Sequence, residues 1–117
     1  MGLSEKVYGI CVSVPPEALK ELMDAIDGAM EPLYPGYSYC FSVTPSKGYW
    51  RTEEGSHPYN GKVGEITEAD EMRLRFVCRE KDLENVLRTI DRVHPYEEPA
   101  VDVIPQIAWR SIIRRPG

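Results

Sequence analysis

Two stretches of the sequence carry residue types that bind metals or transfer protons, and both contain the tripeptide His-Pro-Tyr. The first, EGSHPYNG, contains His57, and the second, VHPYEEPAVDVIP (93–105), contains His94 followed by Glu97 and Glu98. Imidazole and carboxylate groups are ligands for divalent metals, and paired carboxylates serve as acid and base when their environments separate their pKa values. These two stretches therefore raise the question of a metal site or an acid–base site.

The spacing in the second stretch argues against a metal site formed by this segment alone. A His-x-x-Glu pair converges on one side of a helix, but Pro95 and Pro99 disfavour a helix here. In an extended chain Glu97 and Glu98 point to opposite sides, so at most one of them could join His94. The alternative is a rigid elbow with local hydrogen bonds. If a divalent metal does bind, the candidate ligands are His57, His94 and Glu97.

No catalytic motif accompanies these groups. The paired carboxylates lack an adjacent nucleophile or a glycine-rich phosphate loop, no serine lies in a GxSxG motif, and no cysteine has a histidine nearby in sequence. We therefore predict that the chain is not an enzyme and that no cofactor is certain. A hydrolytic site formed by groups that meet only in space is the alternative.

The stretch KGYWRTEEGSHPYNGKVGE (47–65) combines glycines with aromatic and hydrogen-bonding side chains. Such a set suits an anionic or aromatic small molecule. The alternative is that the glycines are turn residues and the aromatic side chains cover a subunit boundary. The candidate ligand-binding residues of the two stretches are Trp50, Arg51, Glu54, His57, Tyr59, His94, Tyr96, Glu97 and Glu98.

Composition limits the class of protein. The 117 residues, 42% of them hydrophobic, predict one domain, with a core at about 6–105 and a C-terminal extension at 106–117. The net charge of -5 argues against a dedicated nucleic-acid binder. No stretch approaches the roughly 18–20 apolar residues of a membrane span. Three cysteines without CxxC spacing predict reduced thiols and a cytoplasmic protein.

Hydrophobic patterning predicts the elements that must position these residues. In chain order they are strands at 6–14, 37–44, 71–78 and 100–109, with helices at 16–30 and 80–93. This β-α-β-β-α-β order predicts an α+β, ferredoxin-like fold, in which a four-stranded antiparallel sheet carries both helices on one face. The segment 45–70 is too long for an ordinary hairpin loop. Because GYWRT and KVGEIT within it are strand-like, we predict an extended β-hairpin there.

One face of the predicted sheet carries no helix. If the aromatic side of 37–44 or the apolar side of 6–14 lies on that face, a single chain exposes a large apolar patch. Patches of this kind usually mark an interface with a partner. The pattern therefore predicts self-association.

Both motifs also resemble a known family. The pattern G-x-[FW]-R…EG(S/A)-x-P…G-x-x-G matches Gly48, Trp50, Arg51, Glu54, Gly55, Ser56, Pro58, Gly61 and Gly64. The closing motif matches His94, Pro95, Tyr96, Glu97, Glu98, Pro99, Ala100 and Asp102. Residues 6–105 thereby resemble the small YqfO-type domain, which is inserted in some NIF-three-like dinuclear-metal proteins and also stands alone. The closing motif is similar to the His-Pro-Tyr-Glu segment of CutA-type proteins, which, like PII signalling proteins, are trimers of ferredoxin-like domains.

The resemblance implies a PII/CutA-like fold and a homotrimer, but not the dinuclear metal site. That site is built from flanking domains with paired histidines, and this chain has two histidines in total. The expected function is a non-enzymatic, trimeric module that binds an unidentified small molecule or protein. The alternative is a metal- or small-anion-responsive sensor with its site between subunits. Its ligands would be His57, His94 and one of Glu97 and Glu98, with Arg51 for an anion.

Overall fold

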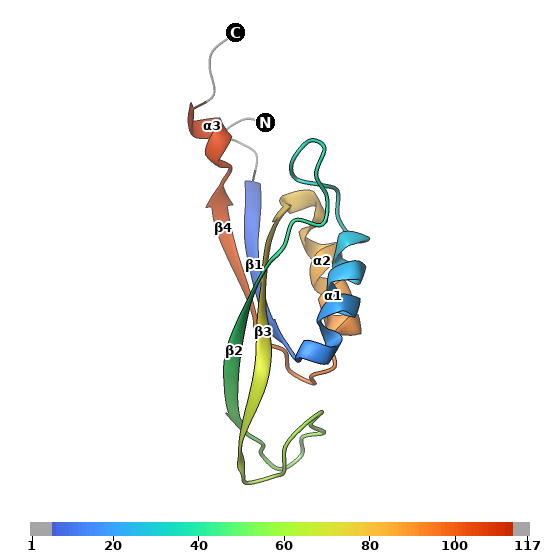
Figure 1. Cartoon of the computed structure of the whole chain (residues 1–117), viewed down its shortest axis with the longest axis vertical. Coiled ribbons are helices and arrows are strands. Elements are labelled where there is room, and N and C mark those ends of the chain that lie inside the picture. Colours follow the sequence, from blue (N-terminus) through green and yellow to red (C-terminus); the bar gives the residue numbers. More distant parts are fainter. Residues whose placement is uncertain (1–5, 114–117) are drawn as a thin grey trace.

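The structure, a computed structural model of the chain, describes residues 6–113 and has the predicted β-α-β-β-α-β order of strands and long helices. The predicted strand at 100–109 is wrong at its end, because β4 stops at Ile107 and Trp109 begins a short helix that was not predicted. The elements are β1 (Lys6–Val14), η1 (Pro16–Ala18), α1 (Leu19–Asp27), β2 (Ser42–Arg51), β3 (Ile66–Arg79), α2 (Glu80–Val93), β4 (Val101–Ile107) and α3 (Trp109–Ile113). The strand order is β2-β3-β1-β4 and every neighbouring pair is antiparallel. Both long helices lie on one side of the sheet (Figure 1). The α+β, ferredoxin-like prediction is therefore confirmed. Of the expected extension, residues 114–117 lie outside the described part.

The hydrophobic core lies between the two long helices and the sheet. Side-chain alternation turns one side of β1 and of β3 toward the helices, which supply their own apolar stripes. The fully buried members are Ile10, Val12, Val14, Leu22, Ile26, Leu74, Cys78, Val86 and Ile90. Each large aliphatic side chain buried in this way contributes about 1.5–3 kcal/mol. The apolar side of residues 6–14 thus belongs to the core and does not form the open face.

The predicted strand at 37–44 is wrong for residues 37–41. β2 begins at Ser42, and the preceding residues form a loop in which Tyr39 has a positive φ of 58°. The Tyr39 hydroxyl donates to Asp24 at 2.8 Å and its N–H donates to Asp27 at 3.1 Å. These bonds attach the loop to α1. Alternating aromatic residues satisfy the strand pattern, but these contacts with a distant helix determine the conformation.

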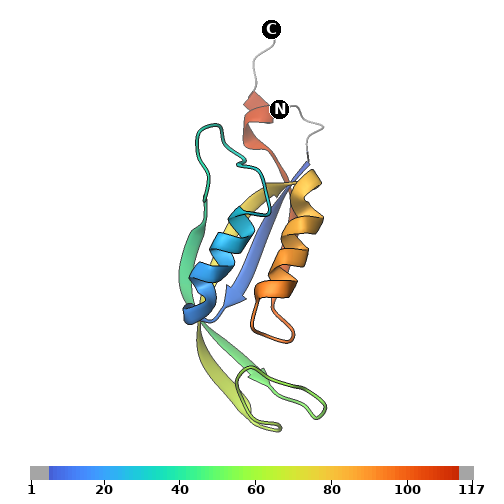
Figure 2. The same cartoon turned by 90° about the vertical axis from the view of Figure 1, so that its right-hand side faces the viewer.

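β2 and β3 form one long hairpin. Their pairing runs without interruption from Ser42 opposite Arg75 to Arg51 opposite Ile66. Residues 48–51 of GYWRT are therefore part of β2 and Thr52 follows it, whereas residues 62–65 lie in the connecting loop and not in a separate strand. The molecule measures 61 × 24 × 22 Å along its principal axes, and the hairpin projects beyond the ends of the helices (Figure 2).

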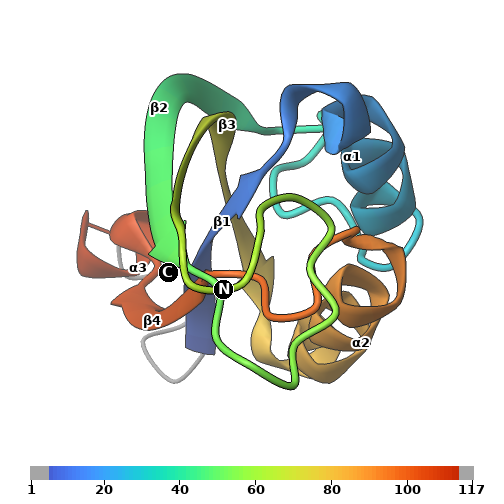
Figure 3. The same ribbon diagram turned by 90° about the horizontal axis from the view of Figure 1, so that it is seen from below.

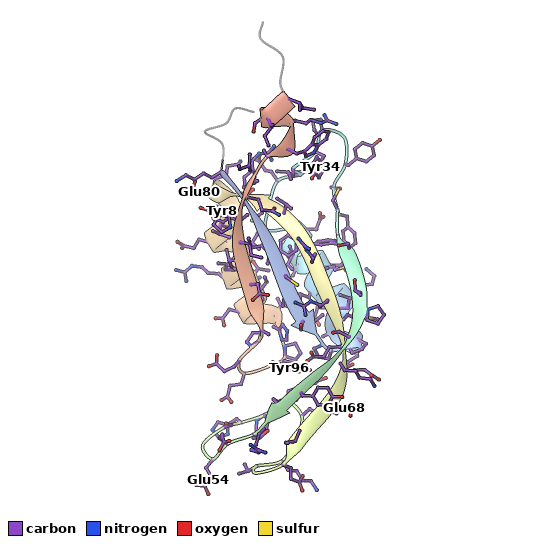
Figure 4. All side chains as sticks on the ribbon, turned by 90° about the vertical axis from the view of Figure 1, so that its left-hand side faces the viewer. Tyr8, Tyr34, Glu54, Glu68, Glu80 and Tyr96 are labelled. Atoms are coloured by element: carbon purple, nitrogen blue, oxygen red, sulfur yellow. The ribbon has the colours of Figure 1, made fainter. Side chains whose placement is uncertain are left out.

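The other face of the sheet carries no helix (Figure 4). The side chains of Arg73 and Arg75 point to this face, because their neighbours Leu74 and Phe76 are buried on the helix side. Near the β4 edge Ile104 is 52% exposed. Among the described residues, no helix has both the length and the apolar character needed to cross a membrane.

Candidate functional site

The His-Pro-Tyr segment at 94–96 begins where α2 ends. The His94 N–H donates to the carbonyl of Ile90 at 2.9 Å, and the His94 backbone then becomes extended (φ -64°, ψ 132°). Pro95 has no N–H and disfavours a helical conformation for the residue before it, so the helix stops here. The segment after it returns to the sheet, where the Ser13 N–H donates to the carbonyl of Ala100 at 3.2 Å. The sequence therefore forms the rigid elbow that leads into β4.

The imidazole of His94 connects this elbow to β1. The side chain is buried, with Nε2 2.7 Å from the carbonyl oxygen of Ser13, and Nδ1 accepts the N–H of Tyr96 at 3.1 Å. Because Nδ1 is an acceptor, the proton of the neutral ring is on Nε2, which donates to Ser13. Burial lowers the pKa of His94, since it disfavours the charged ring. Both ring nitrogens are occupied by hydrogen bonds.

Tyr96 lies at the centre of an aromatic cluster at the base of the hairpin (Figure 4). Its ring centroid is 5.5 Å from that of Trp50 and 5.8 Å from that of Tyr59, with tilted planes. Its hydroxyl donates to Oε2 of Glu71 at 2.9 Å. Burial and this neighbouring carboxylate raise the pKa of Tyr96, so the phenol stays protonated at neutral pH.

Glu71 is a residue of this site that the sequence analysis did not select. It lies on β3, is only 7% exposed, and forms no ion pair with any residue between 6 and 113. Gly48 leaves the space for its carboxylate, because a Cβ at Gly48 would lie 2.5 Å from the Glu71 Cδ. A signal was present in the sequence: alternation along β3 puts Glu71 on the same face as Arg73 and Arg75, away from the core.

The loop at the hairpin tip folds back toward the elbow. The Gly64 N–H donates to the carbonyl of Thr52 at 2.8 Å, closing the loop, and its glycines at 55, 61 and 64 have positive φ angles. The backbone N–H of His57 donates to Oε1 of Glu97 at 3.1 Å. The Tyr59 hydroxyl donates to Glu17 at 2.8 Å. Viewed from below in Figure 3, the tip loop lies over the segment that follows α2.

Between the hairpin and the elbow lies a cavity of about 510 Å³, which we call the hairpin cavity. Its lining includes Ser13, Ser46, Lys47, Gly48, Trp50, Arg51, Thr52, Glu53, Tyr59, Glu71, Arg73, Tyr96, Glu97 and Glu98. Six of the nine candidate ligand-binding residues are thus brought together at one cavity. Glu54, His57 and His94 do not line it; Glu54 lies toward the hairpin tip (Figure 4).

The three candidate metal ligands are not arranged as a site in one chain. Across residues 6–113, no three side chains of histidine, cysteine, aspartate or glutamate gather in a way that could hold a metal ion. His57 is exposed, and a metal on His94 would have to replace one of its two hydrogen bonds. The metal site stays a prediction that requires ligands from a second copy.

A second cavity, of about 390 Å³, lies beside the loop before β2. It is lined by Tyr34, Tyr37, Tyr39 and Arg75, among others, and by no residue of the two His-Pro-Tyr motifs. The exposed free Cys40 lies in its wall. The chemistry-bearing residues gather at the hairpin cavity instead.

Comparison by sequence finds relatives named GTP cyclohydrolase 1 type 2 homolog. The one from Halalkalibacterium halodurans is 30% identical over 102 residues, which is 87% of this chain and 27% of the relative. The one from Bacillus subtilis is 30% identical over 96 residues, 82% of this chain and 26% of the relative. The chain thus spans about a quarter of the length of the curated relatives it matches. No protein-family model matches it.

Comparison of folds finds solved structures that align with most of this chain. A Bacillus cereus protein related to NIF3 aligns with a TM-score of 0.75 and 24% identity, over 91% of this chain and 28% of the other. The periplasmic divalent cation tolerance protein CutA from Archaeoglobus fulgidus aligns with a TM-score of 0.63 and 18% identity, over 86% and 83%. The class is therefore a ferredoxin-like α+β domain with an elongated hairpin. Within that class the chain is similar to a NIF3-like small domain.

Proposed function

We propose that this chain is a YqfO-type, non-enzymatic binding module that self-associates as a homotrimer in the cytoplasm and holds its ligand in the hairpin cavity. The observation that carries the proposal is the assembly of six motif residues around one cavity at the base of the hairpin. The cytoplasmic location is supported by the three free cysteines, two of which are buried.

Self-association is supported by the two edges of the sheet. β2 and β4 lie at opposite edges, and each edge strand leaves backbone N–H and C=O groups without a strand partner. When β2 of one copy pairs with β4 of the next, the contact is heterologous, and its repetition closes a ring of three when each copy is rotated by one third of a turn. Large apolar side chains are exposed at the β4 end: Ile104 is 52%, Ile107 68% and Trp109 55% exposed. A ring of three copies would cover them.

The substitution Ile104→Arg tests this interface. Light scattering of the unaltered chain at micromolar concentration is expected to give three times the mass of one chain. An unpaired guanidinium in an apolar contact is costly, so the variant should associate at least about tenfold more weakly. Asp91→Arg, on the exposed side of α2, is the matched control and should leave the mass unchanged. A stable monomer of the unaltered chain would contradict the assembly.

The arrangement of reactive groups supports a non-enzymatic role. Burial raises the pKa of Cys78 to about 11, so its thiol is protonated at neutral pH and is a poor nucleophile. The imidazole of His94 uses both nitrogens in structural hydrogen bonds. The word cyclohydrolase belongs to the names of relatives of which this chain spans about a quarter.

The second candidate function is a metal- or anion-responsive sensor with a site between copies. Its support is that solved structures of similar fold are named divalent cation tolerance proteins. Further support is that the side chain of His57, in the loop at the hairpin tip, is exposed and therefore open to ligands from a second copy. Arg51 is exposed and lines the hairpin cavity, and its guanidinium would bind an anion there.

A thermal-shift panel of divalent metals and inorganic phosphate separates this candidate from the first. If the sensor function is correct, a metal at about 100 times its dissociation constant should stabilise the chain by about 2.7 kcal/mol. His57→Ala should remove that shift, whereas Glu65→Gln, an exposed change in the same loop, should not. If the thermal shift of the unaltered chain is no larger than that of His57→Ala, the sensor function is rejected.

A further inference from the structure

We propose that the hairpin cavity binds an organic cation that carries N–H donors, a primary ammonium or a guanidinium, on the carboxylate of Glu71. This inference rests on the proposed binding function and names the chemical class of its ligand. The central contact of the proposed site is Glu71, which lies outside both sequence motifs.

The first feature that points to a cation is the buried carboxylate of Glu71. Its side chain is 7% exposed, and within residues 6–113 no lysine, arginine or histidine pairs with it. Tyr96 donates one neutral hydrogen bond to Oε2, at 2.9 Å, while Oε1 receives no hydrogen bond from the described residues. A buried carboxylate is costly unless a positive group pairs with it. An N–H cation in the cavity would supply both the charge and the missing donor.

The second feature that points to a cation is the aromatic wall beside the carboxylate. The rings of Trp50, Tyr96 and Tyr59 are in contact, with centroids 5.5 and 5.8 Å apart, and all three residues line the cavity. The face of an aromatic ring attracts a cation within about 6 Å of its centroid. Glu71 itself is only 7% exposed, and low access to water strengthens its attraction for a cation.

Other ligand classes fit this chemistry less well. A divalent metal would need several ligands, and Glu71 belongs to no group of three metal-binding side chains within residues 6–113. An anion would be repelled by Glu71. Two of the basic groups that line the cavity face carboxylates of their own: Lys47 pairs with Asp70, and Arg73 lies 4.0 Å from Asp102. These pairs reduce the repulsion of an entering cation.

Trp50 itself provides the test. The chain has two tryptophans, so Trp109→Phe leaves Trp50 as the single reporter of the cavity. In that background, n-butylammonium and n-butylguanidinium are titrated against n-butanol and butyrate. The expected result is a saturable change in Trp50 fluorescence with the two cations only. Glu71→Gln, which keeps the side-chain volume and the acceptor for Tyr96, should weaken cation binding at least tenfold. Glu68→Gln, an exposed change on the same strand, should not.

Equal binding of butanol or butyrate, or unchanged cation binding in Glu71→Gln, would overturn the inference. If Glu71→Gln does not fold, the comparison of butylammonium with butanol in the parent chain decides the matter.

The cation could also be a basic side chain from another copy; in that case butylammonium and Glu71→Gln should both reduce the mass seen by light scattering. If the chain is a monomer but binds butylammonium, the trimer is rejected and the cation site stands. If the chain is a trimer that neither binds butylammonium nor dissociates when it is added, the cation site is rejected and the trimer stands.

Discussion

Replacement of His94 by alanine is expected to lower the free energy of unfolding by about 2–4 kcal/mol. The imidazole is 6% exposed; it donates to the carbonyl of Ser13 at 2.7 Å and accepts from the N–H of Tyr96 at 3.1 Å. Alanine would leave both backbone groups without a partner in a site with little access to water. Each such loss costs about 1–3 kcal/mol. Urea denaturation followed by circular dichroism measures the change.

His57→Ala is the matched control, because His57 begins the other His-Pro-Tyr tripeptide. Its side chain is exposed, and the hydrogen bond that it makes to Glu97 uses its backbone N–H. The alanine variant keeps that bond, so its stability should change by no more than about 0.5 kcal/mol. Equal losses in the two variants would mean that the imidazole of His94 does not hold the elbow.

The pH dependence of stability gives a second readout of the same imidazole. Burial lowers the pKa of His94 in the folded chain below its usual value of 6.5. As the pH falls below that value, the unfolded chain takes up a proton that the folded chain does not, so the folded state loses stability. The contribution of His94 is therefore complete above pH 6.5 and is lost as the pH falls toward the folded pKa. The stability difference from His94→Ala should shrink over that interval.

Gly48→Ala is expected to lower the free energy of unfolding by about 1–3 kcal/mol and to weaken ligand binding in the hairpin cavity. The added Cβ would lie 2.5 Å from the Glu71 Cδ, closer than real Cβ atoms approach other atoms. The Glu71 side chain must then move, and its hydrogen bond from the Tyr96 hydroxyl is lost or weakened. Urea denaturation measures the first effect, and Trp50 fluorescence with butylammonium the second.

Gly28→Ala is the control for the effect of adding a methyl group to a glycine. Gly28 ends α1 with a φ of -73°, which any residue adopts, and its nearest contact would be at an ordinary 3.6 Å. Alanine reduces the conformational freedom of the unfolded chain, so stability should be unchanged or rise by up to about 1 kcal/mol. If Gly48→Ala behaved in the same way, the close approach of Glu71 to β2 would not matter for stability.

The sequence by itself determined the fold, because local periodicity records which side of each element is buried. α2 spans Glu80–Val93, as its helical stripe predicts, and β1 spans Lys6–Val14, up to the two prolines that end it. The strand at 37–44 was partly wrong for the same physical reason. Its alternation is real, but the hydrogen bonds of Tyr39 with α1 join residues 12 and 15 positions apart, which periodicity does not report.

The candidate site was determined by sequence only in part. Residue type and proline spacing selected Trp50, Tyr59 and Tyr96, which meet at the hairpin cavity, and they predicted the extended elbow. Residue type and spacing could not show which of the two histidines is buried and which is exposed, since each begins the same tripeptide, His-Pro-Tyr.

Only the tertiary structure placed Glu71 under the Tyr96 hydroxyl, 25 residues away in sequence, with Gly48 making room across the strand pair. That carboxylate is one of 19 acidic residues, and alternation along β3 assigns it only to the face away from the core. What sets it apart is its burial without an ion-pair partner among residues 6–113. Burial is a property of the packed chain, because it depends on which distant side chains exclude water from a group.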